Sequence, residues 1–205
     1  MKLEGKNAFI TGGSRGIGKA ICIALAKEGA NVAFTYKDDK NSALELVNEI
    51  KNLGKLAMCF QSDVRDRKQL RDIFKTIGNS WNNLDILVNN AGINKPTDFN
   101  DITDSDWDEI MSVNLKGPFI VTQEAIRLLE KSPSSSIINI GSVSGQYGGP
   151  RTAHYAASKA GLISLSQVIS RFGASKGIRS NTVAAGIISS SMGSEGLKSS
   201  VVAKA

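Results

Sequence analysis

Short runs of apolar, mostly β-branched residues alternate with longer amphipathic segments along the whole chain. A short apolar run between turn residues is typical of a buried strand, whereas apolar residues three and four apart indicate a helix with one buried face. The predicted strands are Asn7–Thr11, Asn31–Thr35, Leu56–Gln61, Ile86–Asn89, Ser136–Ile140 and Arg179–Ala184. The predicted helices are Gly16–Glu28, Lys40–Leu53, Arg67–Ile77, Asp104–Lys131 and Thr152–Ser175.

The second predicted helix shows the pattern in detail. Leu44, Val47 and Ile50 share one side of this helix and are expected to face the core, while Glu45 and Glu49 point elsewhere. Repeated strand–helix–strand units predict a parallel sheet covered by helices on both faces. Because such crossovers are nearly always right-handed, we expect an α/β fold with a doubly wound parallel sheet in a three-layer sandwich.

Composition and charge narrow the function classes. The chain has 205 residues, so residues 1–205 are expected to form a single domain. Its net charge of +6 is spread without a basic tail, which argues against nucleic acid as a partner and suits an anionic ligand. No signal peptide or membrane span is recognisable, so we expect a cytoplasmic protein without a membrane partner. Cys22 and Cys59 lie in apolar stretches and are expected to be small buried hydrophobes; no metal site is predicted.

A glycine-rich segment, Thr11–Gly18, joins the first predicted strand to the first predicted helix. Gly12 would permit a tight turn, Gly16 would let the backbone approach a pyrophosphate, and Gly18 would let the helix lie close to the strand. The free N–H groups of the helix N-terminus would then face the anion. A flexible turn is the alternative, but the strand–turn–helix context favours a phosphate-binding site.

The spacing of these glycines, TGxxxGxG, resembles that of the short-chain dehydrogenase/reductase family, and further motifs follow in the family's order. The chain is similar in particular to 3-oxoacyl-acyl-carrier-protein reductases. The resemblance covers essentially the whole chain and implies a Rossmann-type fold that binds a dinucleotide. Its further landmarks are Asp63-Val64, Asn89-Asn90-Ala91-Gly92, Asn114, Ser142, and Tyr155 with Lys159 in a YxxxK pattern.

The resemblance implies that Asn114, Ser142, Tyr155 and Lys159 are catalytic. Tyr155 and Lys159 are four residues apart, so on a helix their side chains can meet. An ammonium next to the phenol would lower the tyrosine pKa toward neutral pH and make Tyr155 an acid/base. Ser142 would hydrogen-bond the substrate oxygen, and Asn114 resembles the family residue that positions a water behind the lysine.

The resemblance also implies the residues that bind the cofactor. Arg15 and Lys37 are two cations near the expected adenine ribose and favour the 2′-phosphate of NADP, although Asp38 and Asp39 follow closely and NAD remains an alternative. The expected cofactor-binding residues are Gly12, Ser14, Arg15, Gly16, Ile17, Gly18, Tyr36, Lys37, Asp63, Val64, Asn90, Ala91, Gly92, Tyr155, Lys159, Gly186, Ile188 and Ser190.

Three features depart from the family pattern. Ala185-Gly186 stands where relatives usually have Pro-Gly, and Ser190 stands where relatives have a threonine that helps to hold the carboxamide. Relatives also continue past residue 205 with a helix and a last strand, so we expect the chain to lack these elements. The segment that sets substrate specificity in such folds lies where this sequence ends.

Three functions are compatible with these residues. The first is a reductase of 3-oxoacyl thioesters, with a small-molecule or carrier-bound carbonyl substrate and with Lys131 and Lys176 as candidate docking charges near the cleft. The second is a sugar or polyol dehydrogenase, for which Gln146, Tyr147 and Arg151 supply polar groups. The third is a non-catalytic dinucleotide-binding protein. By analogy with relatives we expect a homotetramer, and the lone histidine, His154, is expected at the rim of the site.

Overall fold

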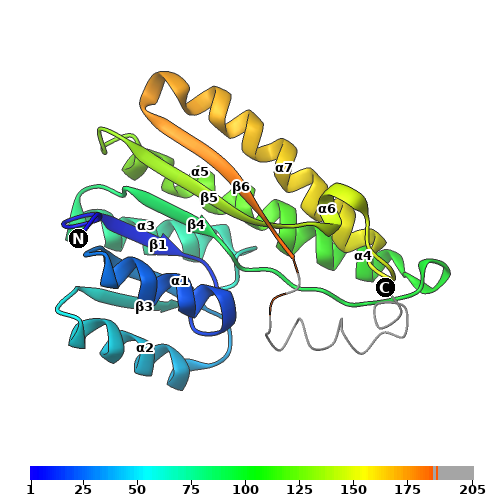
Figure 1. The fold of residues 1–205 in the computed structure, drawn as a ribbon, viewed down its shortest axis with the longest axis horizontal. Helices are drawn as coiled ribbons and strands as arrows, with labels where there is room; N and C mark the ends of the chain where they lie inside the picture. Colours follow the sequence, from blue (N-terminus) through cyan, green and yellow to red (C-terminus); the bar gives the residue numbers. More distant parts are fainter. Residues whose placement is uncertain (187, 189–205) are drawn as a thin grey trace.

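A computed structural model describes residues 1–186 and 188. Its six strands form one parallel sheet in the order β3-β2-β1-β4-β5-β6 (Figure 1). The strands are β1 (Asn7–Ile10), β2 (Asn31–Tyr36), β3 (Ala57–Gln61), β4 (Ile86–Asn89), β5 (Ser135–Ser142) and β6 (Ile178–Ala185). This order confirms the doubly wound α/β sandwich, because the chain builds outward from β1 to β3 and then returns to build from β4 to β6.

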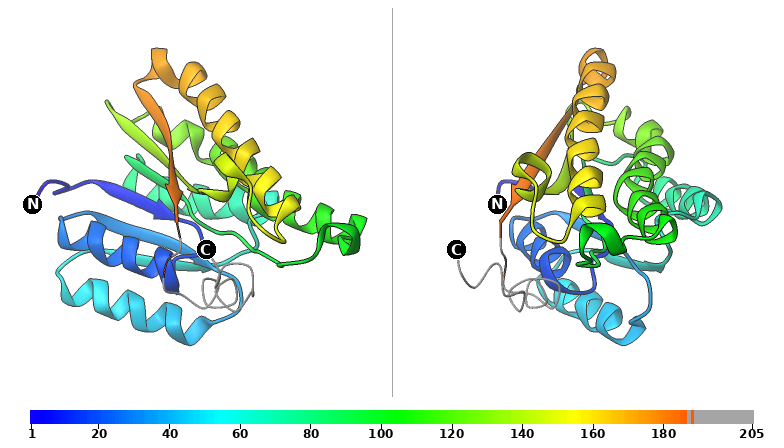
Figure 2. Two further views of the ribbon diagram at one scale, coloured as in Figure 1. Left: turned by 45° about the vertical axis from the view of Figure 1, so that its right-hand side comes forward. Right: turned by 90° about the vertical axis from the view of Figure 1, so that its right-hand side faces the viewer.

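Helices cover both faces of the sheet (Figure 2). The helices α1 (Gly16–Lys27) and α2 (Lys40–Asn52) pack on one face, and α3 (Arg67–Trp81), α5 (Gly117–Leu129) and α7 (Ala153–Gly173) pack on the other. The remaining helical elements are η1 (Phe99–Asp101), α4 (Asp104–Met111), η2 (Ser112–Lys116), α6 (Ser144–Tyr147) and η3 (Ala174–Lys176). No helix among the described residues is long and apolar enough to cross a membrane.

Side-chain caps explain where several helices begin. The Asp39 carboxylate accepts a hydrogen bond from Ser42 N at the start of α2, and the Asp66 carboxylate accepts one from Gln69 N at the start of α3. Thr103 caps α4 in the same way. Such caps satisfy N–H groups that have no partner within the helix.

The buried face of α2 differs in one position from the prediction. Val47 and Ile50 are buried as expected, but Leu44 is 46% exposed and its expected place is taken by Ala43 and Leu46. The buried set therefore follows an i, i+3, i+4, i+7 spacing that begins at the small Ala43.

Part of the sheet face that carries α1 is lined by apolar side chains and is not covered by any helix among the described residues. A hollow of about 410 Å³ lies there between α1 and the strands β4, β5 and β6. Its lining is Ile17, Ile21, Leu25, Ile86, Val88, Ile138, Ile140, Val183, Ala185 and Ile188.

Candidate active site

The predicted motifs meet at one edge of the sheet. Most of them directly follow the C-terminal end of a strand, and parallel strands present these ends on the same side. Asn114, Tyr155 and Lys159 instead lie on helical elements that come later. The strand order reverses between β1 and β4, which leaves a crevice at this edge where the helices diverge to opposite faces. The glycine-rich segment follows β1, and Asn90-Ala91-Gly92 follows β4, so these two motifs border the reversal point directly.

The glycine-rich segment has the geometry that its sequence predicts. Gly12 and Gly16 have φ values of +65° and +54°, a backbone conformation that residues with a side chain rarely adopt. A Cβ on Gly18 would lie 2.1 Å from the carbonyl oxygen of Gly12, so this position requires glycine. The Thr11 hydroxyl oxygen accepts hydrogen bonds from the backbone N–H groups of Asn90 and Ala91, each at 3.0 Å.

Asn90 supports the glycine turn from the neighbouring strand. Its side-chain amide donates to the carbonyl oxygens of Thr11, at 2.9 Å, and Gly12, at 3.0 Å. The side chain is therefore engaged in holding the turn, and the backbone of this segment is what faces the crevice.

The start of α1 fits a phosphate group. Arg15, the N-cap residue, makes no side-chain capping hydrogen bond, in contrast to the caps of α2, α3 and α4. A Cβ built on Gly16 would meet no atom within 4 Å, so open space lies beside the turn. Unpaired N–H groups beside open space suit the pyrophosphate of a dinucleotide.

Charged residues gather at the ends of β2 and β3. The Lys37 ammonium lies 3.4 Å from Asp63 Oδ2, and Arg65 binds Asp63 through both its Nε, at 2.9 Å, and its Nη2, at 2.6 Å. These interactions hold the pKa of the Asp63 carboxyl far below its usual range, and the hydrogen bond from the Arg65 guanidinium is the largest cause. Arg65 was not singled out from the sequence, although its position two residues after Asp63 is a usable signal.

Two acidic residues, Asp38 and Asp39, follow Lys37, and the second of them is hydrogen-bonded to α2. Asp39 accepts hydrogen bonds from the Ser42 N–H, at 2.9 Å, and the Ser42 hydroxyl, at 2.6 Å, and these bonds lower its carboxyl pKa. It is thereby committed to capping α2. The Tyr36 side chain is 6% exposed and packs in the core between the sheet and α1 and α2, so it is the next residue, Lys37, whose side chain emerges here.

Tyr155 and Lys159 lie on the first turns of α7. The Lys159 ammonium is 5.7 Å from the centre of the Tyr155 ring and donates to the carbonyl oxygen of Ile140 at 2.7 Å. A Cβ on Gly92 would lie 3.5 Å from Lys159 Nζ and 3.2 Å from Asn114 Oδ1. The glycine after β4 therefore makes room for the lysine and the asparagine, and the structure brings these predicted residues together.

Burial dominates the protonation of this pair. Burial raises the pKa of the Tyr155 phenol, and a hydrogen bond from Ser142 opposes that increase. Burial also lowers the pKa of the Lys159 ammonium to about 8. The expectation that the ammonium lowers the tyrosine pKa is not met, because desolvation of the phenol is the largest effect on its pKa.

Asn114 lies in a π-helical turn, η2, between α4 and α5. The helix expected over Asp104–Lys131 is thus present as a continuous helical stretch over residues 104–129, but it is interrupted by this π-turn. The Asn114 side chain is fully buried: its oxygen accepts from Ile93 N at 2.9 Å, and its amide donates to Ile93 O at 2.9 Å and to Ser158 Oγ at 3.2 Å. π-turns are frequent at functional sites, and here the turn ties the segment after β4 to α7 through Ser158, a residue that the motifs do not reveal.

Ser142 is the last residue of β5 and is 8% exposed. Its hydroxyl oxygen accepts a hydrogen bond from the backbone N–H of Ser144 at 3.1 Å. Its proton is thus available to the Tyr155 phenol, whose pKa the resulting bond lowers. Ser142, Tyr155 and Lys159 therefore face one another across the end of β5 and the start of α7.

The last predicted cofactor residues follow β6. Gly186 is exposed, and Ile188 is 45% exposed and lines the hollow beside α1. Ser190 lies outside the described residues. Val64, which follows Asp63, is 6% exposed and packs in the core beneath α5.

Two expectations about the surroundings of the site are wrong. His154 is completely buried rather than at the rim, and burial lowers the pKa of its imidazole. Lys176 follows the C-terminal end of α7, roughly 30 Å along the helix from Tyr155 at its start. It pairs with Glu130 at 2.5 Å, and Lys131 donates to Asn82, so neither lysine borders the crevice of its own chain.

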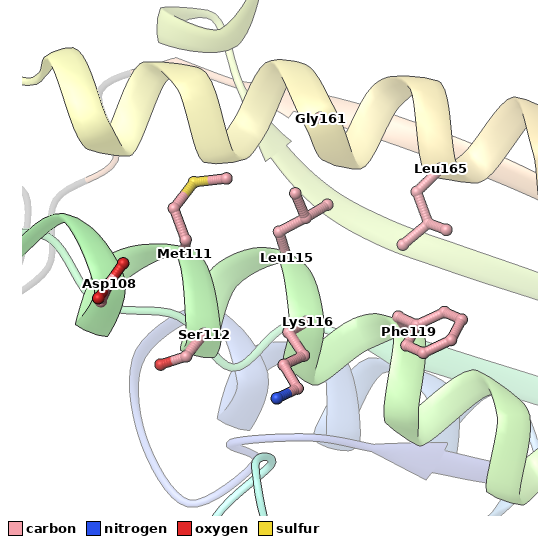
Figure 3. Close-up of a pocket in the computed structure, with 8 residues that line it drawn as sticks. All are labelled: Asp108, Met111, Ser112, Leu115, Lys116, Phe119, Gly161 and Leu165. Carbon is pink, nitrogen blue, oxygen red and sulfur yellow. The ribbon is translucent and has the colours of Figure 1, made fainter.

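A second hollow lies away from the crevice, between the α4–η2–α5 segment and α7. It has a volume of about 670 Å³. In Figure 3, Met111, Leu115 and Phe119 point toward α7, and Leu165 points back from α7, while Lys116 points away. The floor of this hollow is apolar, and Phe119 at its side is 40% exposed.

Comparison with known proteins identifies relatives along almost the whole chain. A family model described as short chain dehydrogenase matches residues 6–199. The 3-oxoacyl-[acyl-carrier-protein] reductase FabG of Staphylococcus aureus is 41% identical over 187 residues, which cover 91% of this chain and 76% of that protein. FabG of Thermotoga maritima is 38% identical and covers 94% of this chain and 78% of its own length. A short chain dehydrogenase structure from Burkholderia cenocepacia in complex with NADP matches with a TM-score of 0.91 at 35% identity, covering 100% of this chain and 82% of that one.

The doubly wound sheet, the glycine turn at its reversal point and these relatives define the class of protein: an oxidoreductase that uses a nicotinamide dinucleotide. The chain belongs to the short-chain dehydrogenase/reductase family.

Proposed function

We propose that the protein is an NADPH-dependent reductase that converts the 3-oxo group of an acyl thioester to a secondary alcohol, and that residues 1–205 form the catalytic domain. The observation that supports this most directly is the grouping of Ser142, Tyr155 and Lys159 around the end of β5, beside the glycine turn. The similarity to FabG proteins, at up to 41% identity, supports the acyl thioester as the substrate.

In this reaction Ser142 and Tyr155 act on the same oxygen. When the substrate binds, the Ser142 hydroxyl donates its single proton to the substrate carbonyl in place of the Tyr155 phenol, which orients the carbonyl carbon toward the nicotinamide position. When bound at the glycine turn, the nicotinamide would supply the hydride that this carbon accepts. Tyr155 transfers its phenolic proton to the carbonyl oxygen, so that the product is an alcohol and the phenolate remains to be reprotonated.

Lys159 and Asn114 support the proton transfer. The buried Lys159 ammonium lies 5.7 Å from the centre of the Tyr155 ring, and although it does not set the phenol pKa in the free protein, it would stabilise the negative charge that forms on the phenolate during turnover. When the cofactor binds, the same ammonium is placed to hold its nicotinamide ribose. Asn114 fixes the π-turn and Ser158 behind the lysine, where a water would connect Lys159 to solvent.

The substrate class is tested by comparing carbonyl compounds of two kinds. We expect NADPH oxidation with acetoacetyl thioesters at a much higher kcat/KM than with a panel of sugars and sugar ketones. Arg151, which was considered for a polar substrate, donates from Nε to Asp98 at 2.8 Å, so its charge is already paired. Faster turnover of a sugar or polyol would instead support the alternative dehydrogenase.

NADP is proposed over NAD because cations surround the expected position of the 2′-phosphate. Arg15 is exposed at the start of α1, and Lys37 and Arg65 share the single carboxylate of Asp63, so these last three side chains carry one net positive charge. Position 37 is a lysine and not a carboxylate that would repel the phosphate. The Asp39 carboxylate accepts a hydrogen bond from Ser42 N and caps α2.

Removal of two of these cations is expected to change the cofactor preference. The double variant Arg15→Ala, Lys37→Ala should lose about tenfold or more in kcat/KM for NADPH per cation, because each supplies a charge-assisted hydrogen bond. The kcat/KM for NADH should change little. The control Lys68→Ala removes a lysine whose side chain is 89% exposed on α3. An equal loss with both cofactors would contradict the assignment of Arg15 and Lys37 to the phosphate.

The hollow beside α4 and α5 supports the proposal that the protein is a homo-oligomer. Its lining is mostly apolar and includes Phe119, which is 40% exposed, and Trp107 on α4 is exposed to the same extent. Packing of this surface against a second copy of the chain would remove these side chains from water.

A further inference from the structure

We propose that Gly145 and the backbone N–H of Ser144 are positioning elements for Ser142, and that together they aim the serine hydroxyl at Tyr155. This inference deepens the proposed function, on which its role in turnover rests. It assigns a task to α6, a helix of four residues that the hydrophobic pattern does not predict.

The first step is the hydrogen bond to Ser142. Ser144 N donates to Ser142 Oγ at 3.1 Å. A hydroxyl has a single proton, so an oxygen that accepts from a fixed N–H must direct its own proton elsewhere, and the Tyr155 phenol, whose pKa a hydrogen bond from Ser142 lowers, is a partner for it. Hydrogen bonds in such a chain strengthen one another, so the amide also makes Ser142 a better donor.

The second step is the contact that fixes this amide. A Cβ on Gly145 would lie 2.7 Å from the carbonyl carbon of Lys159, 2.8 Å from Ala160 N and 2.9 Å from Lys159 Cβ. Two of these atoms belong to the backbone of α7, which cannot rotate away. Gly145 therefore lets α6 lie directly on the turn of α7 that carries Lys159.

The third step is the support from the other sides. Val143 N donates to Ala185 O at 3.0 Å, which ties the start of this segment to the end of β6. At its other end Gly148 N donates to Ser144 O at 3.0 Å, and a Cβ on Gly149 would lie 2.9 Å from Ser144 Oγ. A displaced α6 would therefore move the Ser144 amide, and with it the hydroxyl of Ser142, relative to Tyr155 and Lys159.

The variant Gly145→Ala tests the contact. The added methyl group must push α6 away from α7, and we expect kcat to fall about 10²-fold, the effect of a misplacement near 1 Å. The KM for the carbonyl substrate and the Kd for NADPH should change little, because the glycine turn and the cation cluster are untouched. The limb of the kcat–pH profile that reports Tyr155 should move to higher pH, since the Ser142 hydrogen bond lowers the phenol pKa.

The matched control is Gly173→Ala. A Cβ on Gly173 would lie 2.8 Å from Ile178 O and 2.8 Å from Ile178 Cβ, an equally close contact at the far end of α7, about 27 Å from Tyr155. Both variants should lose thermal stability, but only Gly145→Ala should change kcat and the pH profile. Equal losses of kcat in the two variants would show that Gly145 acts only through stability and would overturn the proposal.

A spectroscopic measurement keeps the contact testable apart from turnover. The chain has three tyrosines, so ¹³C-tyrosine labelling gives few signals, and Tyr155→Phe identifies the one from Tyr155. At fixed pH the Tyr155 Cζ signal should shift in Gly145→Ala and stay in place in Gly173→Ala. An unshifted signal in Gly145→Ala overturns the positioning role, whereas absence of carbonyl reduction by the wild type overturns the proposed function alone.

Discussion

Replacement of Tyr155 by phenylalanine is expected to lower kcat by about 10²- to 10⁴-fold, the usual contribution of a positioned acid. The change removes one oxygen, so the packing of the ring beside Lys159 is retained. NADPH should still raise the melting temperature of the variant, because a ligand that binds the folded state stabilises it and the glycine turn is intact. Initial rates with an acetoacetyl thioester and a thermal-shift titration measure the two effects.

The matched control is Tyr147→Phe, which removes the same oxygen from a tyrosine that is 86% exposed on α6. This variant should retain the kcat of the wild type. Intact turnover in Tyr155→Phe would contradict the proposed mechanism, and if NADPH failed to stabilise either variant, the assignment of the glycine turn to the cofactor would also fail.

The sequence predicted the fold and the location of the site because both depend on periodic patterns. Every expected strand is present, and β5 and β6 are each longer than predicted at both ends. Since parallel strands bring their C-terminal ends to one edge, a motif placed directly after a strand is also placed in space. This is why Gly12, Gly92 and Ser142 could be assigned to one edge of the sheet from their positions along the chain, whereas Tyr155, on the helix after β5, was assigned through the family resemblance.

Features that depend on packing were not predictable in the same way. The π-turn at Ser112–Lys116 adds one residue to a helical turn, which leaves no clear change in the spacing of apolar residues. His154 adjoins Tyr155 in the sequence and was expected at the rim of the site, yet the residue is enclosed where α7 packs against α4. The pairing of Arg65 with Asp63 and the contact of Gly145 with α7 could not be predicted either. The presence of an arginine or a glycine at these positions does not indicate which residues they contact in the folded protein.

The position of Lys176 also shows that closeness in sequence does not predict closeness to the site. Lys176 follows the helix that carries Tyr155 closely in sequence, but the 21 residues of α7 place it at the opposite end of the sheet. A docking role for Lys176 would therefore have to involve a neighbouring copy of the chain. The order of motifs along a sequence reports which strand end they follow, whereas the length of the intervening helix sets the distance between them.

The buried lysine is expected to reduce the stability of the protein at neutral pH. Lys159 is 4% exposed, and burial lowers its ammonium pKa from 10.5 to about 8. Below pH 8 the folded and the unfolded chain both carry the proton, so the folded state bears the full cost of the buried charge, about 3 kcal/mol. Between pH 8 and 10.5 the unfolded state binds more protons than the folded state, and the free energy of unfolding therefore rises with pH.

Comparison of the wild type with Lys159→Met isolates this contribution. From pH 7 to pH 9.5 the free energy of unfolding of the wild type should increase by about 2 kcal/mol relative to that of the variant. The variant should also lose turnover, since no charge remains beside Tyr155, while NADPH should still bind through the glycine turn. Urea unfolding at several pH values measures the difference, and Lys68→Met, which removes an exposed charge, serves as the control. A difference between wild type and Lys159→Met that stays constant over this range would mean that the ammonium is not desolvated, and the position of Lys159 behind the phenol would then have to be revised.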